Sequence, residues 1–138
     1  MKKSLVVLFT LVFFSACQEE GPLTRRAETA VIVPTAELKY RGVFEPTSGI
    51  TVTGEAKIYL ENGQYKVQLD DFSVTSGPDL KVYLSKAATP SEFVNLGNLT
   101  SQAVYPIPSS VDVAGYSHVL IHCQQYNHLF AIASLTQN

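Results

Sequence analysis

The residues of this chain that could do chemistry gather around its second cysteine. His122 directly precedes Cys123, and His128 follows after the short segment 124–127. An imidazole beside a thiol favours the thiolate, which is the nucleophilic and metal-binding form of cysteine. Cys123 and His128 are therefore the candidate redox residues.

The alternation of side chains along a strand decides which histidine can meet the thiol. Successive residues point to opposite faces, so Cys123 shares a face with Ile121, and His122 lies on the other face. If residues 124–127 form the turn, Cys123 pairs across the hairpin with His128, and a slip of one residue would end that pairing. The alternative is a buried structural cysteine, because free cysteine is among the residue types most often found in cores.

Other kinds of site find less support. A Cys–His pair could ligate haem or copper, but metal sites generally use three or four ligands, and only Cys123 and His128 can be named. Asp70 and Asp71 would face opposite sides of a strand, which argues against calcium. Serines such as Ser117 lack a nucleophile-elbow context, so no catalytic residue is predicted and the sequence favours a protein that is not an enzyme.

A second motif, Gly77-Pro78-Asp79, is predicted to form a turn between two strands. Gly77 would supply a positive φ, Pro78 would fix the next φ, and the Asp79 side chain would cap neighbouring backbone amides. These three residues are predicted to act as a structural turn.

The first cysteine, Cys17, indicates a lipid anchor. Lys2 and Lys3 precede an apolar run over residues 5–14, which is long enough for a signal peptide but too short to span a bilayer. Small residues lie at 15 and 16, so a peptidase could cleave before Cys17, whose thiol would then carry the lipid. The alternative is an ordinary signal peptide in which Cys17 has no special role.

This interpretation divides the chain into three parts and predicts its cellular location. Residues 1–16 are the signal peptide, residues 17–36 are the lipidated cysteine with a flexible tether, and residues 37–138 are one domain. We expect a protein of the bacterial cell envelope, anchored through Cys17 in the outer membrane, on its periplasmic or surface face. Acylation of Cys17 would leave Cys123 without a partner for an intramolecular disulfide.

Composition narrows the choice of partners. Loss of Lys2 and Lys3 would leave 8 basic residues against 12 acidic ones, a net charge of −4. Nucleic acid is not expected as a partner, because phosphate binding needs clustered lysine and arginine.

The elements that must position these residues are almost all strands. Alternating, β-rich runs cover residues 40–44, 50–60, 65–72, 80–84, 103–107, 116–123 and 128–135, and Asn62-Gly63 is a strong signal for a type I′ hairpin turn. One helical turn is expected near Pro90, and two of the three histidines are expected to face solvent. The predicted fold is all-β, an antiparallel sandwich or partly open barrel of about 7–9 short strands.

An ordered set of short motifs carries a family resemblance. It comprises Asp71-Phe72, the segment 77–85, Leu96-Gly97-Asn98-Leu99, Tyr105-Pro106-Ile107-Pro108 and the final hairpin that holds Cys123. In this order they resemble the DM-thirteen domain family over roughly residues 40–136. The resemblance implies an all-β domain with an electron-transfer role centred on the family's single cysteine, here Cys123, and assigns Asp79 as the acidic residue of the turn. Two positions differ, because the family often has Trp at 122 and an aliphatic residue at 128.

Two functions follow from these patterns. The first is a membrane-anchored lipoprotein whose redox domain works through Cys123, with a redox protein as partner. The alternative is a non-catalytic binding or scaffold module at the cell envelope, in which Cys123 is buried and structural.

Overall fold

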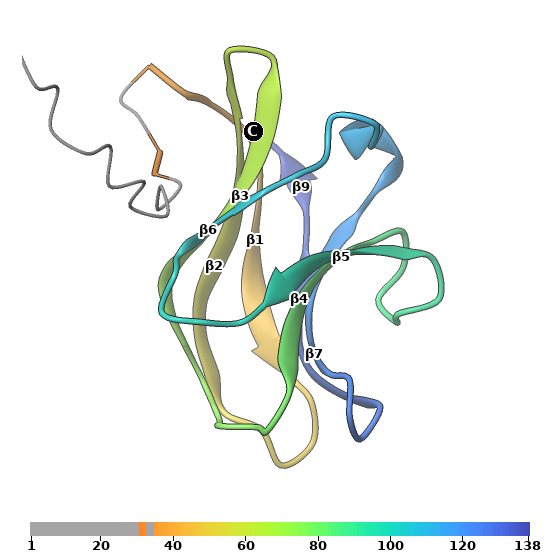
Figure 1. Ribbon diagram of the computed structural model, residues 1–138. Coiled ribbons are helices and arrows are strands. Elements are labelled where there is room, and N and C mark those ends of the chain that lie inside the picture. The colour runs from red at the N-terminus through yellow and green to blue at the C-terminus, as the bar shows by residue number, and fades with distance from the viewer. Residues whose placement is uncertain (1–30, 33–34) are drawn as a thin grey trace, which may run out of the picture.

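The computed structural model describes residues 31–32 and 35–138, and these form an antiparallel sheet that curls toward a barrel (Figure 1). The order across the sheet is β5-β4-β7-β8-β1-β2-β3-β6, and β9 pairs with β1. The outermost strands, β5 and β6, approach each other, so the sheet nearly closes. The strands are β1 (Glu37–Pro46), β2 (Val52–Glu61), β3 (Gln64–Val74), β4 (Leu80–Ser85), β5 (Phe93–Asn98), β6 (Val104–Pro106), β7 (His118–Cys123), β8 (His128–Ser134) and β9 (Thr136–Gln137). The predicted all-β fold is confirmed.

Strand β1 belongs to both halves of the barrel. Along its first part it pairs with β2, and at its end Phe44 pairs with Ala133 of β8. Gly42 lies where β1 passes close to the chain between β8 and β9. A Cβ atom on Gly42 would lie only 2.2 Å from the backbone oxygen of Ser134, so this approach requires glycine.

The interior is filled by one face of each long strand. Ala56 and Ile58 of β2 alternate with partly exposed neighbours, as do Val67 and Leu69 of β3, which is the period-two pattern expected of half-buried strands. The other buried apolar side chains of this core are Phe44, Val82, Leu84, Tyr105, Ile107, Val113, Val119, Ile121, Cys123, Phe130, Ala131 and Ala133.

The predicted hairpin between β2 and β3 is confirmed. Asn62 and Gly63 have φ values of 49° and 78°, and Glu61 pairs with Gln64 on either side of them. Two positive φ values in a two-residue loop are the signature of a type I′ turn, whose twist matches that of the flanking strands.

One local prediction is wrong, and one strand is not predicted. Pro90 lies in a turn rather than in a helix, and Phe93 begins β5, a strand that the sequence analysis does not anticipate. Strand β5 pairs with β4 despite the poor strand formers Asn95 and Gly97, and Gly97 takes a φ of 121° at an irregularity in the pairing. The short 3-10 helix η1 (Val113–Gly115) occurs in a segment for which no element is predicted.

Three loops meet at one end of the barrel, which we call the distal end: residues 47–51, 75–79 and 124–127. Backbone bonds join them, because the amide of Thr75 donates to the carbonyl of Thr51 (2.9 Å) and the amide of Gln124 donates to the carbonyl of Asp79 (3.0 Å). The opposite end holds the start of β1 and the end of the chain, where the amide of Asn138 donates to Lys39 (2.9 Å). Figure 1 shows the distal end at the bottom of the view.

Candidate functional site

Cys123 is the last residue of β7 and pairs with neighbours on both sides. Its partner on β8 is His128 across the four-residue turn 124–127, and its partner on β4 is Leu80. The predicted pairing of Cys123 with His128 is therefore confirmed. The pairing with Leu80 is an addition that the sequence analysis does not include, and it sets the Gly77-Pro78-Asp79 turn beside the cysteine.

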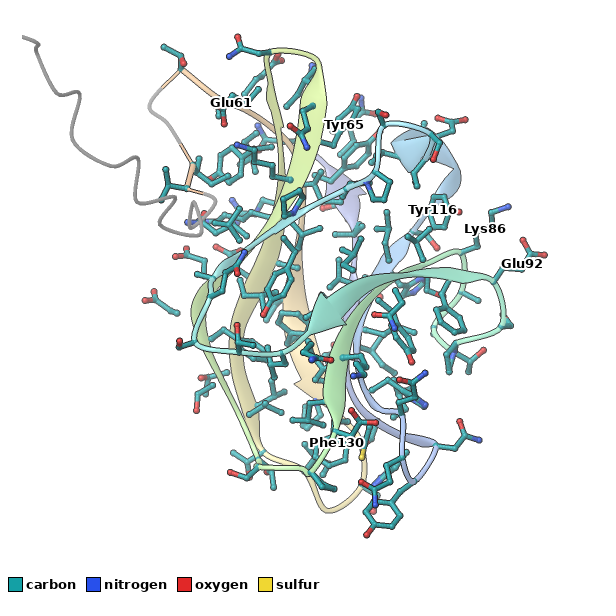
Figure 2. All side chains as sticks on the ribbon, viewed as in Figure 1. Glu61, Tyr65, Lys86, Glu92, Tyr116 and Phe130 are labelled. Atoms are coloured by element: carbon teal, nitrogen blue, oxygen red, sulfur yellow. The ribbon has the colours of Figure 1, made fainter. Side chains whose placement is uncertain are left out.

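The thiol of Cys123 is free and buried. Only 1% of the residue is exposed, and it belongs to the same core cluster as Val119 and Ile121, as strand alternation predicts. His128 lies at the rim of the distal end with an exposed side chain, and its ring packs edge-on against Phe130 at 4.9 Å between centroids. Figure 2 labels Phe130 at this end, opposite Glu61 and Tyr65. The two candidate residues are neighbours in the sheet, but only one of them meets solvent.

Gly77 has a different role from the one predicted. It is not among the residues with a positive φ, so that prediction is wrong. Instead, a Cβ atom at this position would lie 2.9 Å from Leu80 Cδ2 and 3.0 Å from Phe130 Cζ. Glycine lets the turn pack directly onto the two side chains that flank the cysteine.

Asp79 forms an ion pair where the sequence analysis predicts an amide cap. Its carboxylate lies 2.9 Å from Lys81 Nζ, and Lys81 also donates to Asn98 on β5. The backbone carbonyl of Asp79, rather than its side chain, accepts the bond from Gln124. The turn is thus tied to both β5 and the β7–β8 hairpin.

An open cleft of about 470 Å³ lies beside this turn. One wall is the segment that leads into β4, including Gly77, Pro78 and Asp79, and the other is the end of β5 with Leu99 and Thr100. Leu80 lines the cleft and is also the ladder partner of Cys123, so it separates the cleft from the thiol.

His122 is a residue whose importance the sequence analysis misses. It is only 4% exposed. Two of the three histidines are expected to face solvent, whereas only His128 is exposed and His118 is half-buried. The Nε2 atom of His122 lies 3.1 Å from Asn127 Oδ1, and its ring centroid is 5.4 Å from that of Tyr83. Burial lowers the pKa of His122 below its ordinary value of 6.5, while the bond to Asn127 acts in the opposite direction.

Tyr83 is covered from the other side by Phe93. The two rings stack at 4.1 Å with 17° between their planes, and Tyr83 is 2% exposed. Burial raises the pKa of Tyr83 above its ordinary value of 10.0, because the phenolate would lose solvation. Since Phe93 belongs to the unpredicted strand β5, the sequence offered no signal that this outer face would be covered.

The donor atoms of the described residues do not fit a metal site. Over residues 31–32 and 35–138, no group of three or more His, Cys, Asp or Glu side chains is gathered so that it could hold an ion. Cys123 and His128 alone do not make up the ligand sets typical of protein metal centres.

Cys17, the predicted signal peptide and most of the predicted tether lie outside the described residues. Where helices are described, none has the length and apolar character needed to cross a membrane.

In the residues that the structure describes, fold and site together define an all-β domain with a free cysteine, Cys123, at the end of a curled sheet. The model of the family described as "Electron transfer DM13" matches residues 44–135. The chain belongs to this family, which confirms the resemblance carried by the sequence motifs. Comparison with curated proteins and with solved structures gave no match.

Proposed function

We propose that this chain is a lipid-anchored protein of the bacterial cell envelope whose β-domain exchanges electrons through Cys123. Membership of the electron transfer DM13 family supports an electron-transfer-related role. The observation that carries the proposal is the convergence at Cys123. Leu80, which directly follows the Asp79 turn, and His128 come from two separate segments and both pair with this one residue, while Asp79 accepts the bond from the next residue, Gln124.

The single thiol limits the chemistry to exchange with a partner. The partner class is a protein or small molecule that carries a disulfide. The Cys123 thiol releases its proton to solvent, and the thiolate attacks one sulfur of that disulfide. The partner's S–S bond breaks, a mixed disulfide with Cys123 forms, and the second sulfur leaves as a thiolate. Cys123 is thereby oxidised and the partner's leaving sulfur is reduced.

Burial of the thiol requires the distal end to open during this exchange. Opening means breaking the bond from Gln124 to Asp79 (3.0 Å) and the bonds that Thr47 makes to the start of β8, including Oγ1 to the carbonyl of Leu129 (2.6 Å). Loops that hold few such bonds open locally at a lower free energy than the whole fold. His128, which is already at the rim, would then lie beside the exposed sulfur.

The test follows thiol release from an aromatic disulfide reagent by the chain from Gln18 onward, in which Cys123 is the only thiol. We expect exchange at a rate above that set by global unfolding, and none with Cys123→Ala. Thr47→Ala should speed exchange by about two- to tenfold, because a hydrogen bond is worth roughly 0.5–1.5 kcal/mol.

Thr136→Ala is the matched control. Its hydroxyl also donates to a backbone carbonyl, that of Arg41 (3.2 Å), but at the opposite end of the barrel. Equal acceleration by the two threonine variants, each in proportion to its loss of global stability, would contradict a local opening at Cys123.

A second function is favoured by one specific observation. Cys123 is packed in the apolar cluster with Val119 and Ile121, as a small hydrophobic core residue would be. On this alternative the domain is a binding or scaffold module at the envelope. Its signature in the same experiment is complete protection of the thiol until the whole domain unfolds.

A further inference from the structure

Three rings form a row on the outer face of the sheet, on the side away from the Cys123 core. Phe93 of β5 stacks on Tyr83 of β4 at 4.1 Å, and Tyr83 lies 5.4 Å from His122 of β7. Phe93 is 41% exposed, whereas the other two are almost fully buried. The row therefore leads from solvent to the residue that directly precedes Cys123.

The inner end of this row holds an unused proton acceptor. Because Asn127 Oδ1 accepts the bond from His122 Nε2, the proton of the neutral imidazole is on Nε2, and Nδ1 presents a lone pair. In the part of the chain that the structure describes, Nδ1 is the sole buried side-chain nitrogen or oxygen without a hydrogen-bond partner. Such a group costs stability, so its presence calls for an explanation such as a redox role.

We propose that Tyr83 and His122 form a proton-coupled redox pair. A one-electron oxidant at the exposed edge of Phe93 takes one electron from Tyr83. The phenolic proton passes from Oη to His122 Nδ1 after a small rotation of either ring, because no hydrogen bond joins the two atoms in the resting structure. The O–H bond of the phenol breaks and an N–H bond forms. The products are a neutral tyrosyl radical, an imidazolium and the oxidant reduced by one electron.

The surroundings hold both partners in the protonation states that this step needs. Burial disfavours the phenolate of Tyr83 and the imidazolium of His122 in the resting protein. Lys81 on the same strand and Asp79 in the turn before it influence Tyr83, and His128 influences His122 from β8. Removal of the proton together with the electron avoids a buried cationic phenol.

Tyr105 shows what a merely buried tyrosine looks like in this fold. It is 4% exposed, similar to Tyr83, but its hydroxyl accepts the amide of Thr100 (3.2 Å). Among the described residues it has neither a stacked ring nor an imidazole beside it. It is a matched control for the role of Tyr83.

The inference rests on the electron-transfer role proposed above, but it uses different atoms. The experiment is therefore made on Cys123→Ala protein from Gln18 onward, whose folding is checked by circular dichroism. A ruthenium polypyridyl photo-oxidant with a sacrificial acceptor supplies the oxidising equivalent, and electron paramagnetic resonance records the radical. We expect a tyrosyl signal that falls about tenfold in Tyr83→Phe and is retained in Tyr105→Phe.

The proton acceptor is tested by the rate of radical formation. His122→Leu should slow it by roughly a hundredfold, the lower end of what a positioned base contributes, and should abolish the slowing that the parent shows in heavy water. His122→Gln keeps a polar side chain and should behave in the same way. His118→Leu is the control, because its ring lies on the same face of β7 but its Nδ1 is bonded to Ser117 (2.7 Å).

A signal that survives Tyr83→Phe, or rates that respond equally to His122→Leu and His118→Leu, would overturn the pair. Neither result depends on the thiol. If the Tyr83 radical forms as expected but the separate disulfide-exchange experiment fails, that result would count against the role of Cys123 alone.

Discussion

At the scale of single residues, two neighbours in the chain serve opposite sides of one sheet. Cys123 points into the core and His122 points outward, and one peptide unit separates them. Strand alternation predicts this division from the sequence. It does not predict that both would be buried, because the cover over His122 comes from Tyr83, which Phe93 of β5 covers in turn.

The burial of His122 makes folding stability depend on pH. Its pKa in the folded protein lies below the unfolded value of about 6.5. Below that pH the unfolded chain binds a proton that the native state binds less readily, so stability falls as the pH drops. Above about pH 6.5 both states are neutral and the penalty is absent.

Urea unfolding at roughly pH 7.5 and 5.5 checks this expectation. His122→Leu should remove part of the loss of stability between the two pH values. An unchanged pH dependence in His122→Leu would show that the imidazole is equally protonated in the folded and unfolded chains.

At the scale of elements, long-range pairing overrides local preference in some strands and agrees with it in others. The β2–β3 hairpin is predictable because Asn62-Gly63 and the alternating residues beside it point to the same structure. Strand β5 is not, since Asn95 and Gly97 disfavour a strand and only the edge of β4 makes one possible. The pairing of Leu80 with Cys123 is likewise not predictable from local patterns, because it joins segments that are far apart in the chain.

The close approach of β1 to the end of β8 gives a sharp test of packing. Gly42→Ala should lower the free energy of unfolding by about 1–3 kcal/mol, as overpacking generally does, because the new Cβ meets the Ser134 carbonyl at 2.2 Å. Chemical denaturation measures the change.

Gly115→Ala is the control for the same substitution in open space. No atom lies within 4 Å of its added Cβ, so a change within about 0.5 kcal/mol is expected. Similar losses in the two variants would mean that backbone entropy, and not the contact with Ser134, sets the cost at Gly42.

At the scale of the whole molecule, the fold class could be predicted from the sequence, whereas the geometry of the candidate site could be predicted only in part. Period-two alternation and turn residues suffice for an all-β prediction, and a four-residue turn suffices to pair Cys123 with His128. The depth of the thiol and the position of the cleft depend on how the sheet closes on itself. Closure involves strands at the two ends of the order, β5 and β6, which local patterns do not relate.

The proposed lipid anchor is tested on the full chain expressed in a bacterial host. Wild-type protein should partition with detergent and incorporate labelled palmitate, whereas Cys17→Ser should remain in the aqueous phase without label. Cys123→Ser is the control, because it leaves the signal box intact. Label retained in Cys17→Ser would contradict acylation at this residue.

The start of β1 lies opposite the distal end, and this position determines how far Cys123 would lie from the bilayer. Ten residues of β1 at about 3.3 Å each carry the chain roughly 33 Å from its entry point toward the thiol. The segment 17–36 can span at most about 70 Å when drawn straight. A domain anchored through Cys17 would thus present Cys123 on the side away from the membrane, up to roughly 100 Å from the bilayer. A partner would therefore approach from the aqueous space and not from the membrane that holds the lipid anchor.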